Sequence, residues 1–268
     1  MVMAKKVTSP KKDPKEPSKN RSKDPLEDLR SKIKRMRRPA FKPVVEEGDG
    51  PITSSKFSGK VYIPDKEDWP LCPNCKRPMQ LFLQLDLGSL PKELDGCFGS
   101  GLLQMFYCTS YEPNCEVENS GWLPFSKNGV LRIIRPKGPG KDIETPPIER
   151  YFPAKRIVGW TPIDDYPGLE VMDELGIDIA NETYDRIFKE DSKLSWPSPD
   201  QKDKLGGWPF WCQSPEYPQC PKCGKTMRLL FQLDSEDNLP YMWGDVGTGH
   251  ITQCEDHIDV VAFGWSCH

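Results

Sequence analysis

The sequence has only three histidines, all within its last 19 residues, and no apolar run close to the roughly 20 residues that span a bilayer. A Gly-rich phosphate loop, a nucleophile elbow and an HExxH helix are also missing. Lysines open the chain, but no apolar core follows them, so we expect no secretory signal. These absences lead us to expect a cytoplasmic protein that is not an enzyme and has no membrane partner.

Apolar residues are few and prolines are many. Hydrophobic residues make up 36% of the chain, mean hydropathy is −0.64, and 28 prolines argue against long helices. We expect helices only at 180–190 and, in shorter form, at 169–175. Apolar residues alternate over 79–85 and 227–233, and further strand-like runs occur at 101–108, 130–134, 156–160 and 259–265. The expected fold class is β-rich α+β, with two sheets.

Charge is distributed unevenly. Residues 1–40 hold 14 of the 37 basic and 5 of the 40 acidic residues, which leaves 23 basic and 35 acidic residues, or −12, in 41–268. We expect 1–40 to be a disordered basic tail, with a short helix possible over 25–38. Five basic side chains there could contact nucleic acid: Lys32, Lys34, Arg35, Arg37 and Arg38. The alternative is that the tail folds back on the acidic body.

One 15-residue pattern occurs twice. Residues 72–86 read CPNCKRPMQLFLQLD, and residues 220–234 read CPKCGKTMRLLFQLD, at an offset of 148. Such an echo predicts two copies of one structural unit. We expect two pseudo-repeated β units, residues 72–134 and 220–265, each opened by a zinc-knuckle-like CPxC motif. They belong to a single domain, 41–268, whose repeats (about 57–150 and 204–268) are joined by an acidic, loop-rich connector.

The CPxC spacing lets two thiolates reach one metal ion. The ligands expected for the first site are Cys72, Cys75, Cys108 and Cys115, and those for the second are Cys220, Cys223, Cys254 and His257. His250 is an alternative to His257, and reduced cysteines in a metal-free core are the alternative to both sites. Because all four ligands of each site come from the protein, we expect up to two structural Zn²⁺ ions.

The two strands end in the same polar residues. Gln84 and Asp86 recur as Gln232 and Asp234. The aspartates could act as an acid/base pair, but an aspartate at a strand end more often begins a turn. We expect these residues to form a binding seam between the repeats together with four tryptophans, which are Trp160, Trp208, Trp211 and Trp243. The alternative for the tryptophans is internal packing.

Several segments together resemble the YwqG family: LFLQLDLGSLP (81–91), GLLQMFY (101–107), GWTPIDDYPGLE (159–170), KLGGWPFWCQ (204–213) and LLFQLDSED (229–237). The resemblance runs from about residue 57 to the end, and it implies a compact β-rich pair of repeats with a groove between them. The chain is more distantly similar to the programmed cell death protein 2 family. That similarity implies a chaperone-like protein that shields a basic client, and such domains are also suspected of neutralising toxins.

The leading hypothesis is a non-catalytic module that binds another protein, such as a basic client. One alternative is a nucleic-acid-binding protein that uses the basic tail and the knuckles. Another is a metal-dependent hydrolase with an open metal at His250 or His257.

Overall fold

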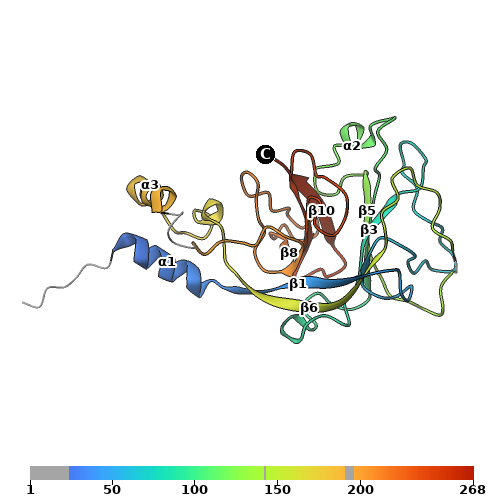
Figure 1. Cartoon of the computed structure of the whole chain (residues 1–268), viewed down its shortest axis with the longest axis horizontal. Helices are drawn as coiled ribbons and strands as arrows, with labels where there is room; N and C mark the ends of the chain where they lie inside the picture. The colour runs from blue at the N-terminus through green and yellow to red at the C-terminus, as the bar shows by residue number, and fades with distance from the viewer. Residues whose placement is uncertain (1–23, 142, 191–195) are drawn as a thin grey trace, which may run out of the picture.

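The computed structural model describes residues 24–141, 143–190 and 196–268. Ten antiparallel strands form one nearly closed sheet in the order β10-β9-β8-β7-β1-β6-β2-β3-β4-β5 (Figure 1). The strands are β1 (Arg38–Glu47), β2 (Lys56–Phe57), β3 (Gln80–Asp86), β4 (Leu102–Tyr107), β5 (Gly129–Ile134), β6 (Lys155–Asp165), β7 (Lys204–Gly206), β8 (Arg228–Asp234), β9 (Thr248–Gln253) and β10 (Val261–Ser266). The fold is therefore β-rich, as expected, but it has one sheet where two were predicted.

Helices are few and short. They are α1 (Pro25–Arg35), α2 (Cys115–Glu118), α3 (Asn181–Glu190) and the 3-10 turns η1 (Lys92–Leu94) and η2 (Leu169–Val171). The helix predicted at 180–190 is thus present as α3, and the one at 169–175 is reduced to η2 and the turn after it. Among the described residues, no helix is both long enough and apolar enough to cross a membrane.

The long pair β1–β6 runs through the middle of the sheet and was largely missed. Only 156–160 of β6 was predicted, and β1 lies in a stretch with prolines and charges where apolar alternation is weak. Pro39 and Pro43 are both inside β1, where they pair with Asp164 and Trp160. Residues 1–23 of the predicted tail lie outside the described residues. Its boundary at residue 40 is corrected, because α1 and the start of β1 precede it.

The flanks of this central pair have matching strand registers. On one side Lys56 of β2 pairs with Gln84 of β3, and on the other Lys204 of β7 pairs with Gln232 of β8. Register shifts also fall at matching places, between Leu81 and Leu83 in β3 and between Leu229 and Phe231 in β8. The flanks β2–β5 and β7–β10 therefore place their strands in the same order on either side of β1–β6.

The main core fills the space that the curved sheet encloses. Phe82 of β3 packs against Trp243 at 5.2 Å between ring centroids, and Trp243 packs against Phe263 of β10 at 5.0 Å. All three side chains are at least 92% buried. A separate small core joins α1 to α3 through Leu26, Leu29, Ile33 and Ile187. The sheet is thus held by one core that both flanks share.

Candidate metal centres and the slot between the sheet edges

The first cysteine cluster lies where the turn before β3 meets the end of β4. Cys72 and Cys75 stand on that turn, Cys108 follows β4, and Cys115 begins α2. The turn is closed by hydrogen bonds from the Cys72 N–H to the Arg77 carbonyl and from the Lys76 N–H to the Cys72 carbonyl, both 2.9 Å. Together these elements gather four thiols whose sulfur atoms lie within 4.8 Å of one another.

The second cluster is built in the same way before β8. Cys220 and Cys223 stand on a turn whose Cys220 N–H donates to the Lys225 carbonyl at 2.8 Å. Cys254 follows β9, and His257 comes three residues later. The His257 Nδ1 lies 3.7 Å from the sulfur atoms of both Cys220 and Cys254. The structure therefore brings together the eight predicted residues as two sets of four.

The donor spacing fits a tetrahedral metal ion. Four thiolates bound at about 2.3 Å to one Zn²⁺ lie about 3.8 Å apart. The sulfur atoms of Cys75 and Cys108 are 3.7 Å apart, and so are those of Cys223 and Cys254. All ten cysteines are free thiols, so no disulfide competes for these positions. Each cluster could hold one metal ion with no coordination position left over.

The knuckle backbone favours the thiolate form. Burial raises the pKa of the Cys108 thiol, and it acts in the same direction on Cys75 and Cys220. For these two thiols, backbone N–H groups and neighbouring thiols outweigh burial. The Arg77 N–H lowers the pKa of Cys75, and the Lys222 N–H helps to lower the pKa of Cys220 to about 6. The thiolate is the form that binds metal.

His250, the alternative ligand, lies elsewhere. Its Nε2 is 2.9 Å from the Phe210 carbonyl, and its ring packs on Trp211 at 4.3 Å between centroids. Burial lowers the pKa of His250 to about 3. The cluster therefore uses His257, and His250 is a neutral histidine of the interior.

The polar residues of the predicted seam form hydrogen bonds and ion pairs within the protein. Gln84 and Gln232 are fully buried, and each amide group donates to carbonyls of the loop that leads into the neighbouring short strand. The Asp86 carboxylate accepts from the Gly88 N–H at 3.0 Å, which is the expected turn. Asp234 instead pairs with Lys202 at 3.0 Å.

The four tryptophans do not converge on one surface. Trp243 belongs to the main core, and Trp160 is partly buried and packs against it. Trp208 donates its indole N–H to the Met36 carbonyl at 2.9 Å, and Trp211 packs on Tyr217. Trp208, Trp211 and Trp243 are each at most 6% exposed. This corrects the expectation of a binding seam, since the alternative, internal packing, describes where these side chains lie.

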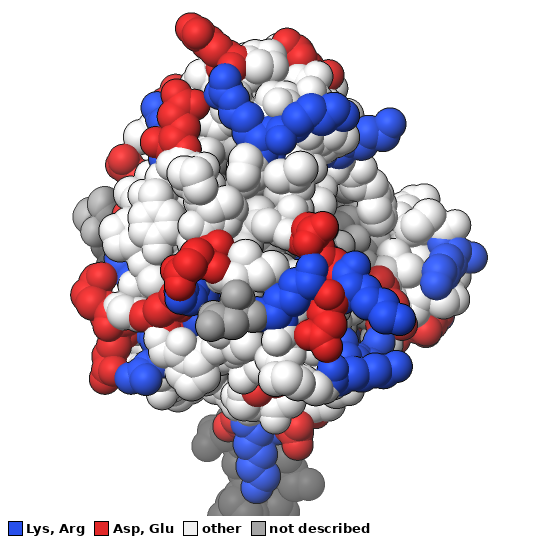
Figure 2. Space-filling view, turned by 90° about the vertical axis from the view of Figure 1, so that its right-hand side faces the viewer, with Lys and Arg blue, Asp and Glu red and all other residues white. Residues whose placement is uncertain are grey.

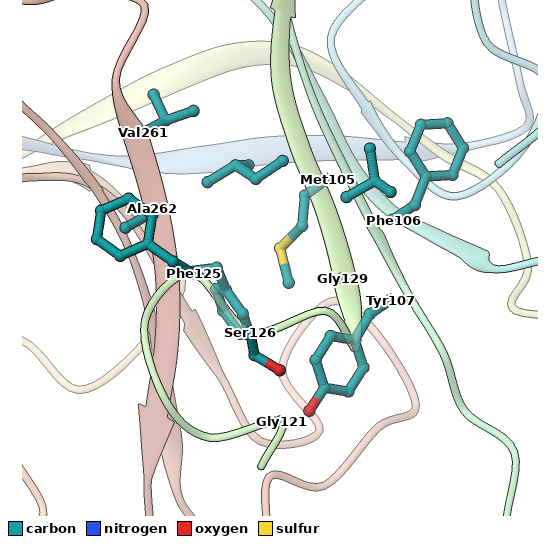
Figure 3. Close-up of a pocket in the computed structure, with 12 residues that line it drawn as sticks. Met105, Phe106, Tyr107, Gly121, Phe125, Ser126, Gly129, Val261 and Ala262 are labelled. Carbon is teal, nitrogen blue, oxygen red and sulfur yellow. The ribbon is translucent and has the colours of Figure 1, made fainter. Parts of the chain in front are cut away.

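A different opening, lined by none of the predicted seam residues, separates the two ends of the sheet. We call it the slot, the gap between β5 and β10, which lie near each other without pairing. It contains a cavity of about 250 Å³ (Figure 3). Met105 and Tyr107 of β4 face Val261 of β10 across it, and Phe125 comes from the loop before β5. Apart from the Tyr107 and Ser126 hydroxyls, the side chains that line the cavity are apolar.

Main-chain groups of both edges point into the slot. In antiparallel pairs, successive residues direct their N–H and C=O groups alternately toward one neighbour and away from it. The Cys108 N–H donates to the Asn128 carbonyl, so Leu131 and Ile133 direct their main-chain groups away from β4. The Cys254 N–H donates to the Val260 carbonyl, and by the same alternation Phe263 directs its groups away from β9.

Both ends of the slot are bridged. At one end, the Trp265 N–H of β10 donates to the Trp122 carbonyl at 3.1 Å. At the other end, Arg135, just after β5, forms an ion pair with Asp259 at 2.8 Å. Between these bridges, no backbone hydrogen bond joins β5 to β10 within the described part of the chain. The opening exists because β5 and β10 are the two end strands of the sheet, which the curvature of the sheet brings near each other.

Two comparisons with known proteins bear on identity. A stretch of 39 residues, 15% of the chain, is 49% identical to "Uncharacterized protein YpfL" of Salmonella typhimurium and covers 9% of that protein. The family described as "Domain of unknown function (DUF1963)" matches residues 55–263, which include both cysteine clusters, β5 and the first half of β10. The chain belongs to this family.

Proposed function

We propose that this protein is a non-catalytic module that binds an extended segment of another protein in the slot. The observation that supports it is the pair of unpaired strand edges, which face each other over an apolar cavity. Exposed strand edges recruit extended peptides through main-chain hydrogen bonds, and pockets beside them select alternate side chains.

The slot suits a peptide segment with an apolar side chain. A peptide backbone in the slot would find main-chain donors and acceptors on both sides. These are the N–H and C=O groups of Leu131 and Ile133 in β5 and of Phe263 in β10. The adjacent cavity of about 250 Å³ would take one large apolar side chain, which Met105 and Leu131 would contact. Burying such a side chain contributes about 1.5–3 kcal/mol.

In this proposal the two clusters hold structural Zn²⁺. Four protein ligands close each site, whereas a catalytic zinc keeps one position for water. The matched knuckle hydrogen bonds and strand registers support the further interpretation that residues 72–134 and 220–265 are copies of one unit. The same closed donor sets are the reason to rank a metal-dependent hydrolase last.

A basic client remains part of the proposal, on weaker grounds. The net −12 of residues 41–268 favours a basic partner. However, Figure 2 shows one face on which basic and acidic side chains are interleaved, so charge there is not gathered into one acidic patch. The chaperone-like and toxin-neutralising roles implied by the resemblances stay predictions, as does a cytoplasmic location.

The test uses random dodecamer peptides displayed on phage, selected against the zinc-loaded full chain. We expect enriched peptides with apolar residues at alternate positions, and we expect Leu131→Lys, which places a charge in the cavity, to weaken their binding at least tenfold. Val158→Lys is the matched control, because Val158 is 44% exposed on β6, away from the slot. In the complex, the amides of Leu131, Ile133 and Phe263 should become protected from hydrogen exchange.

Two results would contradict the proposal. One is selection that enriches no peptide, or peptides that bind Leu131→Lys as tightly as the unchanged protein. The other is binding of single-stranded DNA that falls steeply with salt and is lost in Lys34→Glu/Arg35→Glu, without any peptide binding. That second outcome would favour the nucleic-acid alternative.

A further inference from the structure

A second cavity, of about 220 Å³, shares no lining residue with the slot. It forms where the start of β1 meets β7, β8 and the turn after η1. Two arginines, Arg38 and Arg228, line it together with the apolar side chains of Leu94 and Phe98. Two positively charged side chains therefore lie beside one small cavity.

Arg38 is held in place by an aromatic ring. Its guanidinium carbon lies 3.3 Å from the centroid of the Trp208 ring, and the Trp208 indole N–H is fixed by its bond to the Met36 carbonyl. In the described part of the chain, no carboxylate accepts a hydrogen bond from Arg38. The stacking therefore orients a guanidinium whose N–H donors remain available to a ligand.

Arg228 is likewise positioned but incompletely satisfied. Its guanidinium lies 4.9 Å from the centroid of the Phe98 ring, donates to the Cys97 carbonyl and pairs with Glu255 at 3.2 Å. Its Nε is buried and has no acceptor among the described residues. A buried donor without an acceptor costs about 1–3 kcal/mol, so an acceptor supplied by a ligand would be favourable.

The two arginines are close enough to oppose each other's charge. Desolvation is the main cause that lowers the pKa of Arg38, and the charge of Arg228 adds to it, against opposite contributions from Tyr217, Glu255 and Asp165. Among the described residues that line the cavity, Glu255 is the one carboxylate, and it is already paired with Arg228. An anion between the guanidinium groups would relieve this repulsion.

The remaining wall leaves room for the rest of a ligand. Gly206 and Gly207 line part of the wall, which therefore has no side chain there, and their φ of +70° and +78° favours glycine. Leu94 and Phe98 are buried beside it and offer an apolar contact.

We propose that this cavity binds a small organic oxyanion, a phosphate monoester or a carboxylate, between Arg38 and Arg228, with its apolar part against Leu94 and Phe98. The phosphate and carboxylate groups share the chemistry that guanidinium recognises, namely paired oxygen acceptors. The ligand's apolar body distinguishes this site from one that collects inorganic ions.

The test is calorimetric titration of the zinc-loaded full chain with phenyl phosphate, benzoate and inorganic phosphate. We expect saturable binding of one organic anion, at least tenfold tighter than that of inorganic phosphate, and the tighter organic anion identifies the ligand class. Arg38→Gln should weaken that binding at least tenfold. Arg156→Gln is the control, because Arg156 pairs with Glu46 and does not line the cavity.

A second measurement protects the test from a variant that folds poorly. In the unchanged protein, the ligand should shift the NMR signal of the Trp208 indole N–H, because that ring lies under Arg38. Absence of saturable binding by either organic anion would overturn the proposal. So would equal affinity for Arg38→Gln and the unchanged chain.

Discussion

The carboxylate of Glu116 accepts a hydrogen bond from the Tyr107 hydroxyl at 2.8 Å, and Tyr107 lines the cavity of the slot. The same carboxylate accepts from Tyr241 at 3.1 Å. Glu116 directly follows Cys115, a member of the first cysteine cluster, and both belong to the short helix α2. One turn of helix therefore connects a candidate metal centre to the floor of the slot.

This connection predicts that metal at the first cluster, and not at the second, orders the slot. Cys75→Ser should increase hydrogen exchange over residues 108–128 and weaken binding of the selected peptides, since α2 loses its anchor. Cys223→Ser is the matched variant, because it removes the equivalent ligand from the second cluster. Equal effects of the two substitutions on exchange in 108–128 would contradict the connection.

Glu116 itself should stabilise the fold. Glu116→Ala leaves two largely buried tyrosine hydroxyls without their acceptor, and hydrogen bonds to charged groups contribute about 1.5–3 kcal/mol each. We expect a loss of about 2–4 kcal/mol in the free energy of unfolding, measured by urea denaturation. Glu118→Ala should change stability by less than about 1 kcal/mol, since Glu118 is exposed on the same helix and its carboxylate bonds only Asn74 among the described residues.

Local spacing predicted which residues gather in the two candidate metal-binding clusters. A CPxC turn is determined by four consecutive residues. The later pair of each cluster begins just after a strand, β4 or β9, that pairs with the strand following the CPxC turn. The choice of His257 over His250 also followed from spacing. Such short-range geometry can be deduced before the fold is known.

The Gln-Leu-Asp repeat was assigned to the wrong surface for a physical reason. Gln232 donates to the carbonyls of Asp200, Gln201 and Lys202, in the loop that leads into β7. Repetition of this residue therefore reflects the same internal hydrogen bonding in both halves. A polar side chain on a strand does not reveal by pattern alone whether it faces solvent or a buried loop.

The residues that form the slot could not be predicted from the sequence. Its edges, Gly129–Ile134 and Val261–Ser266, are more than 120 residues apart and face each other only because the ten strands curve around one core. Pairing order across such distances depends on the whole sheet. The same holds for the cavity between Arg38 and Arg228, because these residues are far apart in the sequence and lie in different strands, β1 and β8.

Two lysines at equivalent positions should differ in their contribution to stability. Lys204 forms an ion pair with Asp165 at 2.9 Å in which both side chains are fully buried. Lys56 pairs with Asp49 at 2.5 Å, but the Asp49 side chain is 32% exposed. Removing one partner of a buried pair leaves an uncompensated charge and costs about 3–5 kcal/mol.

We therefore expect Lys204→Met to lower the free energy of unfolding by about 3–5 kcal/mol. Lys56→Met should cost less, because water can solvate the remaining Asp49 carboxylate. Urea denaturation of both variants checks this order. A larger loss for Lys56→Met would show that exposure of the acidic partner does not decide the energy.

Asp203 provides a pH-dependent contribution to stability. Its side chain lies in the interior, where desolvation and, second, the charge of Asp237 raise its pKa to about 7. Hydrogen bonds from Asn238 and from the Asp234 N–H act in the opposite direction. The pKa in the folded state thus lies above the unfolded value, which is near 3.8.

The sign of the effect follows from proton binding. Between pH 4 and 7 the folded protein keeps a proton that the unfolded chain releases, so this contribution favours folding below about pH 4 and is lost as pH rises through about 7. Asp203→Asn mimics the protonated form, so its stability relative to the unchanged protein should rise from pH 5 to pH 8. Urea denaturation of both proteins across this range measures the difference, in which the titration of the metal ligands cancels. Asp237→Asn removes the neighbouring charge, so with Asp203 unchanged it should reduce the slope of stability against pH. A difference between Asp203→Asn and the unchanged protein that does not vary with pH would show that Asp203 is ionised throughout this range.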